Sequence, residues 1–399
     1  RRHRGCHRNG RRVMARASER PSERPSDRPP ASRQIREGER VIQLDEAGTS
    51  PGSLVIDPSA AAPVLDLTVF DGDHLTEKHI ESISEVKPYL DKGEGVVWLN
   101  IDGVGNAGLI AEIGKLFDLH RLTLEDVTQV HQRPKVEVFR GYVFVVVRMV
   151  FLEGALETEQ LSLVIGDRYL LTFQEGRPGD CLEPVRTRLR KAIGRLRSAG
   201  PDYLAYALID TVTDHYYPVV GEYGDRLDRL EDEIIQEKAY DDIVQRIHEN
   251  KRELLLLRRT IFPQRDSIAT LMRDPTPLIS EETRVFFRDV ADHTVQLVEL
   301  LDSYRELAAS LVDIHLSLAS HRMNEVMRIL TLVGAFFIPL TFVAGLYGMN
   351  FDPDSSALNM PELRHPYGYP LTILFMVMMT VGMVIYFRRK GWLGRPNKR

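Results

Sequence analysis

The triplet Gly348-Met349-Asn350 ends a long apolar segment, and its residue types suit the binding of a hydrated cation. Residues 329–348 form twenty positions without a charge. The last carbonyl groups of a helix have no partners inside the helix. Such neutral oxygens suit Mg²⁺, which gives up its water shell reluctantly. Glycine and asparagine are also ordinary residues at helix ends, so the triplet alone indicates a cation site only weakly.

Polar and small residues recur at intervals of three and four along this segment and before it, which places them on one face of a helix. They are Asp313, Ser317, Ser320, Asn324, Met327, Thr331, Gly334, Ile338, Thr341 and Gly345. Small residues at this spacing suit close helix packing. Asp313 and Asn324 on the same face favour a water-lined pore among several copies of the helix, because polar groups need water, an ion or each other.

Two apolar segments, residues 329–348 and 367–387, match the roughly 20 residues that cross a bilayer core. Basic residues precede the first segment and follow the second, whereas the loop 349–366 holds three acidic residues and one arginine. The positive-inside rule therefore predicts an external loop and two cytoplasmic termini. We expect a multi-pass protein of the cell (inner or plasma) membrane, in contact with membrane lipid.

Residues 1–40 differ in composition from the rest of the chain, with thirteen arginines against five acidic residues, a surplus of +8. We interpret residues 1–50 as a disordered basic tail, with translation expected to begin at Met14. An arginine-rich tail could bind nucleic acid, but a disordered segment that precedes the start of translation is the preferred interpretation, and we expect no nucleic-acid partner. Cys6 and Cys181 are too few for a disulfide framework and fit a reducing compartment.

Residues 54–180 show the β-branched and aromatic runs of strands, separated by turn signals and two helical patterns, and predict a cytoplasmic α/β domain. The predicted strands are 65–70, 96–102, 136–150, 160–165 and 169–174, and the predicted helices are 81–90 and 109–117. Residues 184–280 predict cytoplasmic helices over 204–217, 223–237 and 241–262, with breaks at Pro218 and Pro263.

Residues 281–348 predict one stalk helix that continues into the first membrane span. Ser280 is a suitable N-cap, and residues 283–333 contain no glycine or proline. These residues alone would span about 75 Å as a helix. The external loop 349–366, a second span over 367–387 and a basic cytoplasmic tail over 388–399 complete an α+β membrane protein.

Several motifs in order resemble the CorA magnesium and cobalt transporters, over roughly residues 60–395. They are Leu124-Glu125-Asp126-Val127, His131-Gln132-Arg133-Pro134-Lys135-Val136, Asn324-Glu325-Val326-Met327, Pro339-Leu340-Thr341-Phe342, Tyr347-Gly348-Met349-Asn350 and Met360-Pro361-Glu362-Leu363. The resemblance implies a homopentameric funnel with the first span lining the pore. It also implies transport of Mg²⁺, with Co²⁺ and Ni²⁺ as alternative substrates. Residues 352–359 make the external loop longer than is usual in the family.

Site residues follow from the same resemblance. The selectivity filter would be Gly348, Met349 and Asn350. The pore would be lined by Asp313, Asn324, Met327, Leu330, Gly334, Ile338, Thr341 and Gly345. A regulatory Mg²⁺ that closes the channel would bind between subunits at Asp126 and Asp289.

Other interpretations have less support. Residues 103–108 match the GxGxxG pattern of nucleotide-binding loops, but the acid that follows lies in a turn-like segment. Asp289 and His293 share a helix face, yet two ligands do not define a zinc site. A zinc transporter of the same superfamily is the main alternative, and the intact Met349 argues against it. A membrane-anchored scaffold would not need the polar stripe, and no motif supports an enzyme.

Overall fold

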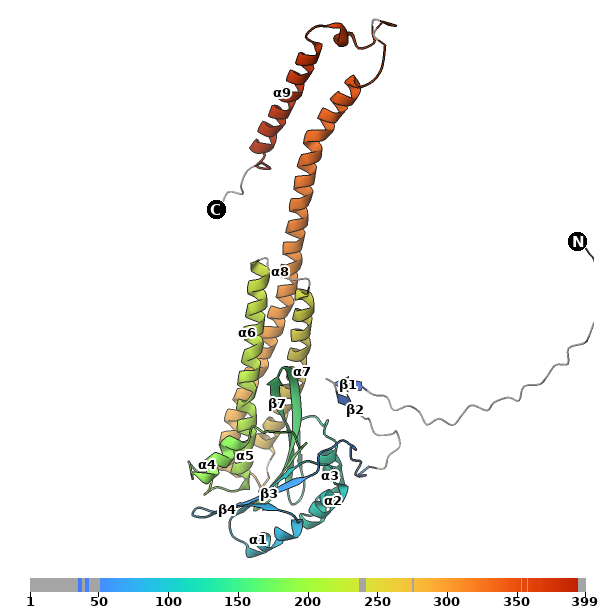
Figure 1. Ribbon diagram of the computed structural model, residues 1–399. Coiled ribbons are helices and arrows are strands. Elements are labelled where there is room, and N and C mark those ends of the chain that lie inside the picture. Colours follow the sequence, from blue (N-terminus) through green and yellow to red (C-terminus); the bar gives the residue numbers. More distant parts are fainter. Residues whose placement is uncertain are drawn as a thin grey trace, which may run out of the picture.

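The computed structural model describes residues 51–236, 242–274, 276–352, 354–356 and 358–393, together with strands β1 (Ile35–Glu37) and β2 (Arg40–Ile42). A domain built on a sheet lies at one end of the molecule (Figure 1). A single helix leads away from it, and a last helix runs back beside the far end of that helix (Figure 1). Apart from β1 and β2, the predicted basic tail lies outside the described residues, as do residues 394–399.

The main sheet has seven strands in the order β4-β3-β5-β9-β8-β7-β6. Strands β5 and β9 are parallel, and all other neighbours are antiparallel. The strands are β3 (Val64–Phe70), β4 (Leu75–Ile80), β5 (Val96–Asp102), β6 (Lys135–Val138), β7 (Val143–Glu153), β8 (Ala155–Ile165) and β9 (Tyr169–Gln174).

Both faces of the sheet are buried, because successive side chains of a strand point to opposite faces. On β5, Val97 and Leu99 pack with one hydrophobic core, and Trp98 packs with the other. The first core is completed by η1 (Ile83–Glu85), α1 (Lys87–Lys92), α2 (Ala107–Leu116) and α3 (Arg121–Thr128). The second is completed by α4 (Glu183–Arg190), α5 (Pro201–Asp214), α6 (Tyr216–Ile235), α7 (Ile243–Arg273) and the first part of α8 (Glu281–Tyr347).

Helix α8 has 67 residues and confirms the predicted long helix. At 1.5 Å per residue its length is about 100 Å. Ser280 caps it as predicted, since its hydroxyl accepts a hydrogen bond from the Thr283 backbone N–H at 3.2 Å. The first part of α8 is held against α5, α6 and α7 by a buried face. That face is formed by Thr283, Phe287, Val290, Thr294, Leu297, Val298, Leu301, Ala308 and Leu311.

Two predicted proline breaks are wrong. Pro263 lies inside α7, where Ile261 and Gln264 on either side of it are buried. The Ser267 hydroxyl donates to the Pro263 carbonyl at 2.9 Å. Tertiary packing therefore maintains the helix through the proline. Pro218 is the third residue of α6, where a missing N–H costs little because the first helical N–H groups have no partners in the helix.

Other elements differ from their predicted bounds, and two of them differ in kind as well. The predicted strand 136–150 is two antiparallel strands, β6 and β7, joined through a turn in which the Phe139 N–H donates to the Tyr142 carbonyl at 2.9 Å. The turn contains Arg140 and Gly141, and this glycine was the signal in the sequence that the prediction of one strand did not use. The predicted helix 81–90 is a short 3-10 helix followed by α1.

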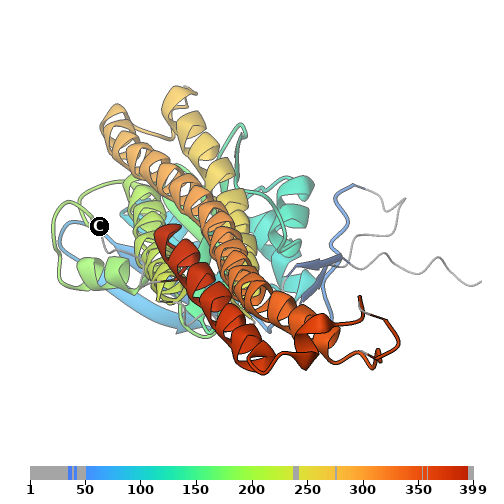
Figure 2. The ribbon, with the colours of Figure 1, turned by 90° about the horizontal axis from the view of Figure 1, so that it is seen from above.

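Helix α9 (Gly368–Arg389) runs beside the outer part of α8 in both views (Figures 1 and 2). The Phe336 and Phe387 rings, one from each helix, lie 5.7 Å apart. The outer half of α8 and α9 are both long and apolar enough to cross a membrane. Most of their side chains are uncovered in the single chain, so their apolar surface requires lipid or other subunits.

Candidate cation pathway and binding sites

The predicted pore residues lie on a face of α8 that α9 leaves uncovered. Met327, Leu330 and Ile338 are 53%, 63% and 70% exposed. Asp313, Asn324, Thr341 and Gly345 are also exposed, and Gly334 is half-buried. A side chain at Gly345 would meet nothing within 4 Å. One copy of the chain therefore presents the whole face without enclosing it.

The predicted selectivity triplet follows the last turn of α8. The Gly348 N–H donates to the Ala344 carbonyl at 2.9 Å, and the Met349 N–H donates to the Leu346 carbonyl at 3.3 Å. Gly348, Met349 and Asn350 are all exposed. The triplet and the last carbonyl groups of α8 thus lie together at the end of the uncovered face.

The loop between α8 and α9, which the sequence predicts to be external, is folded on itself. The Asn359 amide donates to the Asp352 carbonyl and to the Ser355 hydroxyl, both at 3.0 Å. Asp354 forms an ion pair with Arg364 at the start of the return path. Since these contacts hold the extra residues together, the loop returns the chain to α9 as a compact turn.

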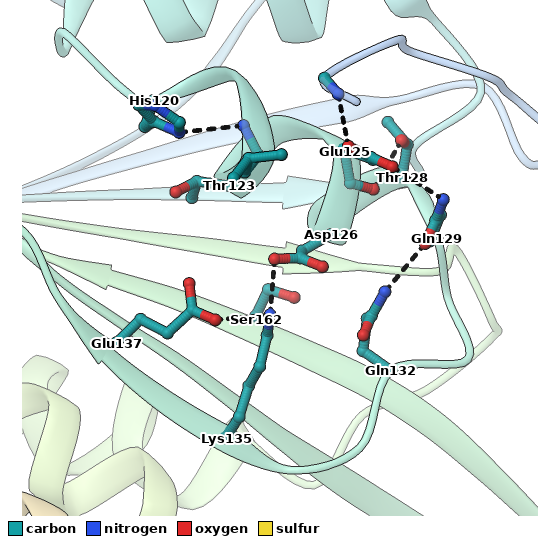
Figure 3. Close-up of polar contacts among 12 residues, drawn as sticks. His120, Thr123, Glu125, Asp126, Thr128, Gln129, Gln132, Lys135, Glu137 and Ser162 are labelled. Atoms are coloured by element: carbon teal, nitrogen blue, oxygen red, sulfur yellow. Dashed lines mark hydrogen bonds and ion pairs between the residues drawn. The ribbon is translucent and has the colours of Figure 1, made fainter. Parts of the chain in front are cut away.

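Asp126 lies at the start of a polar network between α3 and the sheet (Figure 3). Its Oδ2 is 2.6 Å from Nζ of Lys135, whose Nζ is also 2.8 Å from Oε1 of Glu137. The side chains of Asp126 and Lys135 are 14% and 28% exposed. Gln160 on β8 fixes the backbone, because its amide donates to the Asp126 carbonyl at 2.9 Å.

Burial sets the electrostatics of this network. It raises the pKa of Asp126, and the Glu137 and Glu125 carboxylates act in the same direction, whereas Lys135 opposes them. The neighbouring Glu125 is held from the other side, where its Oε2 accepts the Gly52 N–H at 2.6 Å. A cation in contact with Asp126 therefore offsets the desolvation of a charged carboxylate.

Asp289 belongs to a second cluster, on α5 and α8. Its Oδ2 lies 4.0 Å from Nε2 of His293, whose Nδ1 lies 3.8 Å from Oδ1 of Asp214. Ligand atoms of Asp210, Asp214 and His293 all lie within 4.8 Å of one another. Burial raises the pKa of Asp210 to about 6, and the Asp214 and Asp289 carboxylates contribute while His293 opposes them. The cluster thus concentrates negative charge around one imidazole.

The glycine-rich loop at residues 103–108 is occupied by the chain itself. The Gly105 N–H donates to the Ala61 carbonyl at 2.8 Å. A Cβ at Gly105 would lie 2.5 Å from the carbonyl oxygens of Ala60 and Ala61. These glycines are explained by the close approach of a neighbouring backbone segment, which takes the space that a bound phosphate would need.

Comparison with known proteins agrees with this arrangement. The model of the CorA-like Mg²⁺ transporter protein family matches residues 93–389. The chain is 39% identical over 350 residues to the cobalt/magnesium transport protein CorA of Thermotoga maritima, covering 87% of this chain and 97% of that protein. The chain belongs to the CorA family. Membership of a transporter family also confirms that it is not an enzyme.

Further CorA relatives match in sequence and in fold. The cobalt/magnesium transport protein CorA of Methanocaldococcus jannaschii is 29% identical over 266 residues, covering 65% of this chain and 80% of that protein. The complete structure of the CorA magnesium transporter from Methanocaldococcus jannaschii matches with a TM-score of 0.66 at 23% identity. This match covers 84% of this chain and 99% of that chain. The predicted fold class, with its sheet domain, long helix and second apolar helix, is confirmed.

The structure brings together residues that the sequence left separate. Asp210 and Asp214 join Asp289 and His293, although only the second pair was noted in the sequence. The four-residue spacing of Asp210 and Asp214 on one helix could have been noticed in the sequence. The docking of α5 on α8, which brings them to His293, could not. Asp126 and Asp289 lie in separate clusters of the single chain, the first beside Lys135 and the second beside His293.

Proposed function

We propose that this CorA-family chain carries Mg²⁺ across the cell membrane, with Co²⁺ as an alternative substrate, through a pore formed by α8 of five subunits. The observation that carries the proposal is the uncovered stripe on α8, which leads from Asp313 to the Gly348-Met349-Asn350 triplet. One such face cannot enclose a path, whereas a ring of them can. The printed names of the relatives, cobalt/magnesium transport proteins, support the same ions.

Each part of the stripe has a chemical role in this proposal. The Asn350 amides and Gly348 carbonyls hold an ion through its water shell, since Mg²⁺ dehydrates reluctantly. Apolar rings at Met327, Leu330 and Ile338 form a constriction that closes by dewetting. Asn324, Thr341 and Asp313 supply polar contacts along the path, and Gly334 and Gly345 allow close helix approach.

Regulation is assigned to the two carboxylate clusters. Asp126 of one subunit and Asp289 of the next repel each other when no metal is present and are bridged when Mg²⁺ binds. His293 links Asp289 to Asp210 and Asp214, and these carboxylates add to the attraction of the cluster for a divalent cation. Intracellular Mg²⁺ thus favours a closely packed, closed pentamer. In this proposal both termini and the two clusters lie in the cytoplasm, where the clusters sense the metal.

The decisive experiment measures ion uptake by the purified protein in liposomes for Mg²⁺, Co²⁺, Ni²⁺ and Zn²⁺. Asn350→Ala should reduce Mg²⁺ uptake at least tenfold while the oligomer, measured by light scattering, stays intact. The matched control is Asn359→Ala, which removes an amide already satisfied within the loop. Normal Mg²⁺ uptake by Asn350→Ala would remove the triplet from the mechanism, and Zn²⁺ uptake in preference to Mg²⁺ would replace the proposed substrate.

A further inference from the structure

The cation nearest to Asp126 is supplied by the protein itself. Nζ of Lys135 lies 2.6 Å from Oδ2 of Asp126, between α3 and β6 (Figure 3). The lysine is held in place at several points. Its strand pairs with β7 in register with Val146, its Nζ lies 5.8 Å from the centre of the Phe144 ring, and the side chain is only 28% exposed. This ion pair is therefore a built feature of the fold.

Lys135 also has a second carboxylate within reach. Oε1 of Glu137 lies 2.8 Å from the same Nζ, and this residue is more exposed, at 39% against 14% for Asp126. A lysine carries a compact charge on a flexible stem with three donors. It can therefore release Asp126 and keep Glu137 without becoming an unpaired charge.

We propose that Lys135 is an internal competitor of the regulatory Mg²⁺ for Asp126 and sets the Mg²⁺ concentration at which the channel closes. This inference rests on the proposed role of Asp126. When the metal is absent, Lys135 neutralises the carboxylate. When Mg²⁺ binds, the ammonium releases Asp126 and stays paired with Glu137, so the metal must displace an ion pair and its apparent affinity is reduced accordingly.

The competition predicts shifts of opposite sign for two neighbouring residues. Lys135→Met leaves Asp126 and Glu137 without their cation, so closure should need about three- to tenfold less Mg²⁺, the range expected for a partly buried ion pair. Glu137→Gln removes the alternative partner and confines Lys135 to Asp126, so closure should need more Mg²⁺. A general loss of stability would move both variants in the same direction.

The test uses the full-length protein in liposomes and records ion current and protease protection of the sheet domain against MgCl₂ concentration. Lys135→Arg should close within about twofold of the parent, because it keeps the charge. Lys115→Met, which removes the same charge from the exposed side of α2, is the control for net charge. If Lys135→Met closes at the parent concentration or above it, the proposal is overturned.

Two further variants keep the result interpretable. If Lys135→Met does not assemble, the test relies on Glu137→Gln alone. A closure curve of Glu137→Gln that is unchanged, or shifted to lower Mg²⁺ concentration, overturns the proposal. Asp126→Asn separates this inference from the proposed function. If Asp126→Asn closes normally, both the regulatory role of Asp126 and the competition fail, while the transport proposal is unaffected. If it loses Mg²⁺ closure while Lys135→Met closes like the parent, only the competition fails.

Discussion

Replacement of Glu159 by glutamine is expected to stabilise the protein increasingly as the pH rises. Glu159 lies on β8 with 0% of its surface exposed. Its Oε1 accepts the Glu175 N–H at 2.9 Å, and its Oε2 is buried without a hydrogen-bond partner among the described residues. Burial raises the pKa of Glu159 to about 7, and the Glu175 and Asp102 carboxylates add to the rise.

The sign follows from proton binding in the two states. The folded protein keeps a proton on Glu159 that the unfolded chain releases above a pH of about 4.5, so stability falls as the pH rises from about 4.5 to about 7. At 1.36 kcal/mol per pKa unit, the cost is about 3 kcal/mol at pH 8 and about 1 kcal/mol at pH 5. The buried amide of Glu159→Gln has its own cost, which is the same at both pH values. The advantage of the variant should therefore grow by about 2 kcal/mol from pH 5 to pH 8.

Urea unfolding in detergent, followed by tryptophan fluorescence, measures this difference. Trp98 is a suitable probe, because it lies in the core on β5 and its Nε1–H donates to Thr172 at 3.0 Å. Glu153→Gln, at the exposed end of β7, is the control and should show no pH-dependent gain. Parallel stability curves for Glu159→Gln and the parent between pH 5 and pH 8 would refute the reasoning.

Two other predictions concern the cation clusters. Asp126→Asn combined with Asp289→Asn should retain conduction and abolish closure by cytoplasmic Mg²⁺ in current recordings. Shifting the ratio of closed to open channels from 1:99 to 99:1 needs about 5.5 kcal/mol, or about 1 kcal/mol from each of five sites. If the double variant closes at the Mg²⁺ concentration of the parent, the sensor lies elsewhere. His293→Ala should weaken Co²⁺ binding, measured by calorimetry, at least tenfold and Mg²⁺ binding much less, because imidazole suits transition metals. His248→Ala, exposed on α7, is its control, and equal losses for both ions would exclude His293 as a ligand.

Features that depend on one helix could be predicted from the sequence. The length of α8, its cap at Ser280 and the common face of Asn324, Ile338 and Thr341 follow from residue types and from a period close to 3.6. In the structure α8 has the predicted length and cap, and Asn324, Ile338 and Thr341 are all exposed on it. Each depends on neighbours within a few positions along the chain, so no knowledge of the tertiary fold was needed.

Features that depend on how elements dock could not be predicted. The meeting of Asp214 with His293 requires the register of α5 against α8, and the Asp126–Lys135 pair requires the placement of β6 beside α3. Pro263 was misjudged for the same reason, because burial on both sides of it maintains α7 against the local preference of proline. Local propensity decides only where packing does not oppose it.

The two proposed functions lie on one helix and can be separated by experiment. Asp289 is in the packed first part of α8, and the Gly348-Met349-Asn350 triplet follows its last turn. A metal that pulls on Asp289 acts directly on the helix that carries the pore face, so coupling between the sites needs no chain of intermediate contacts. Asn350→Ala should then alter uptake with Mg²⁺ protection of the sheet domain intact, whereas the Asp126 and Asp289 variants should lose that protection with ion selectivity intact. If Asn350→Ala also lost Mg²⁺ protection, or if the Asp126 and Asp289 variants also lost ion selectivity, the assignment of selectivity and closure to opposite ends of α8 would be contradicted.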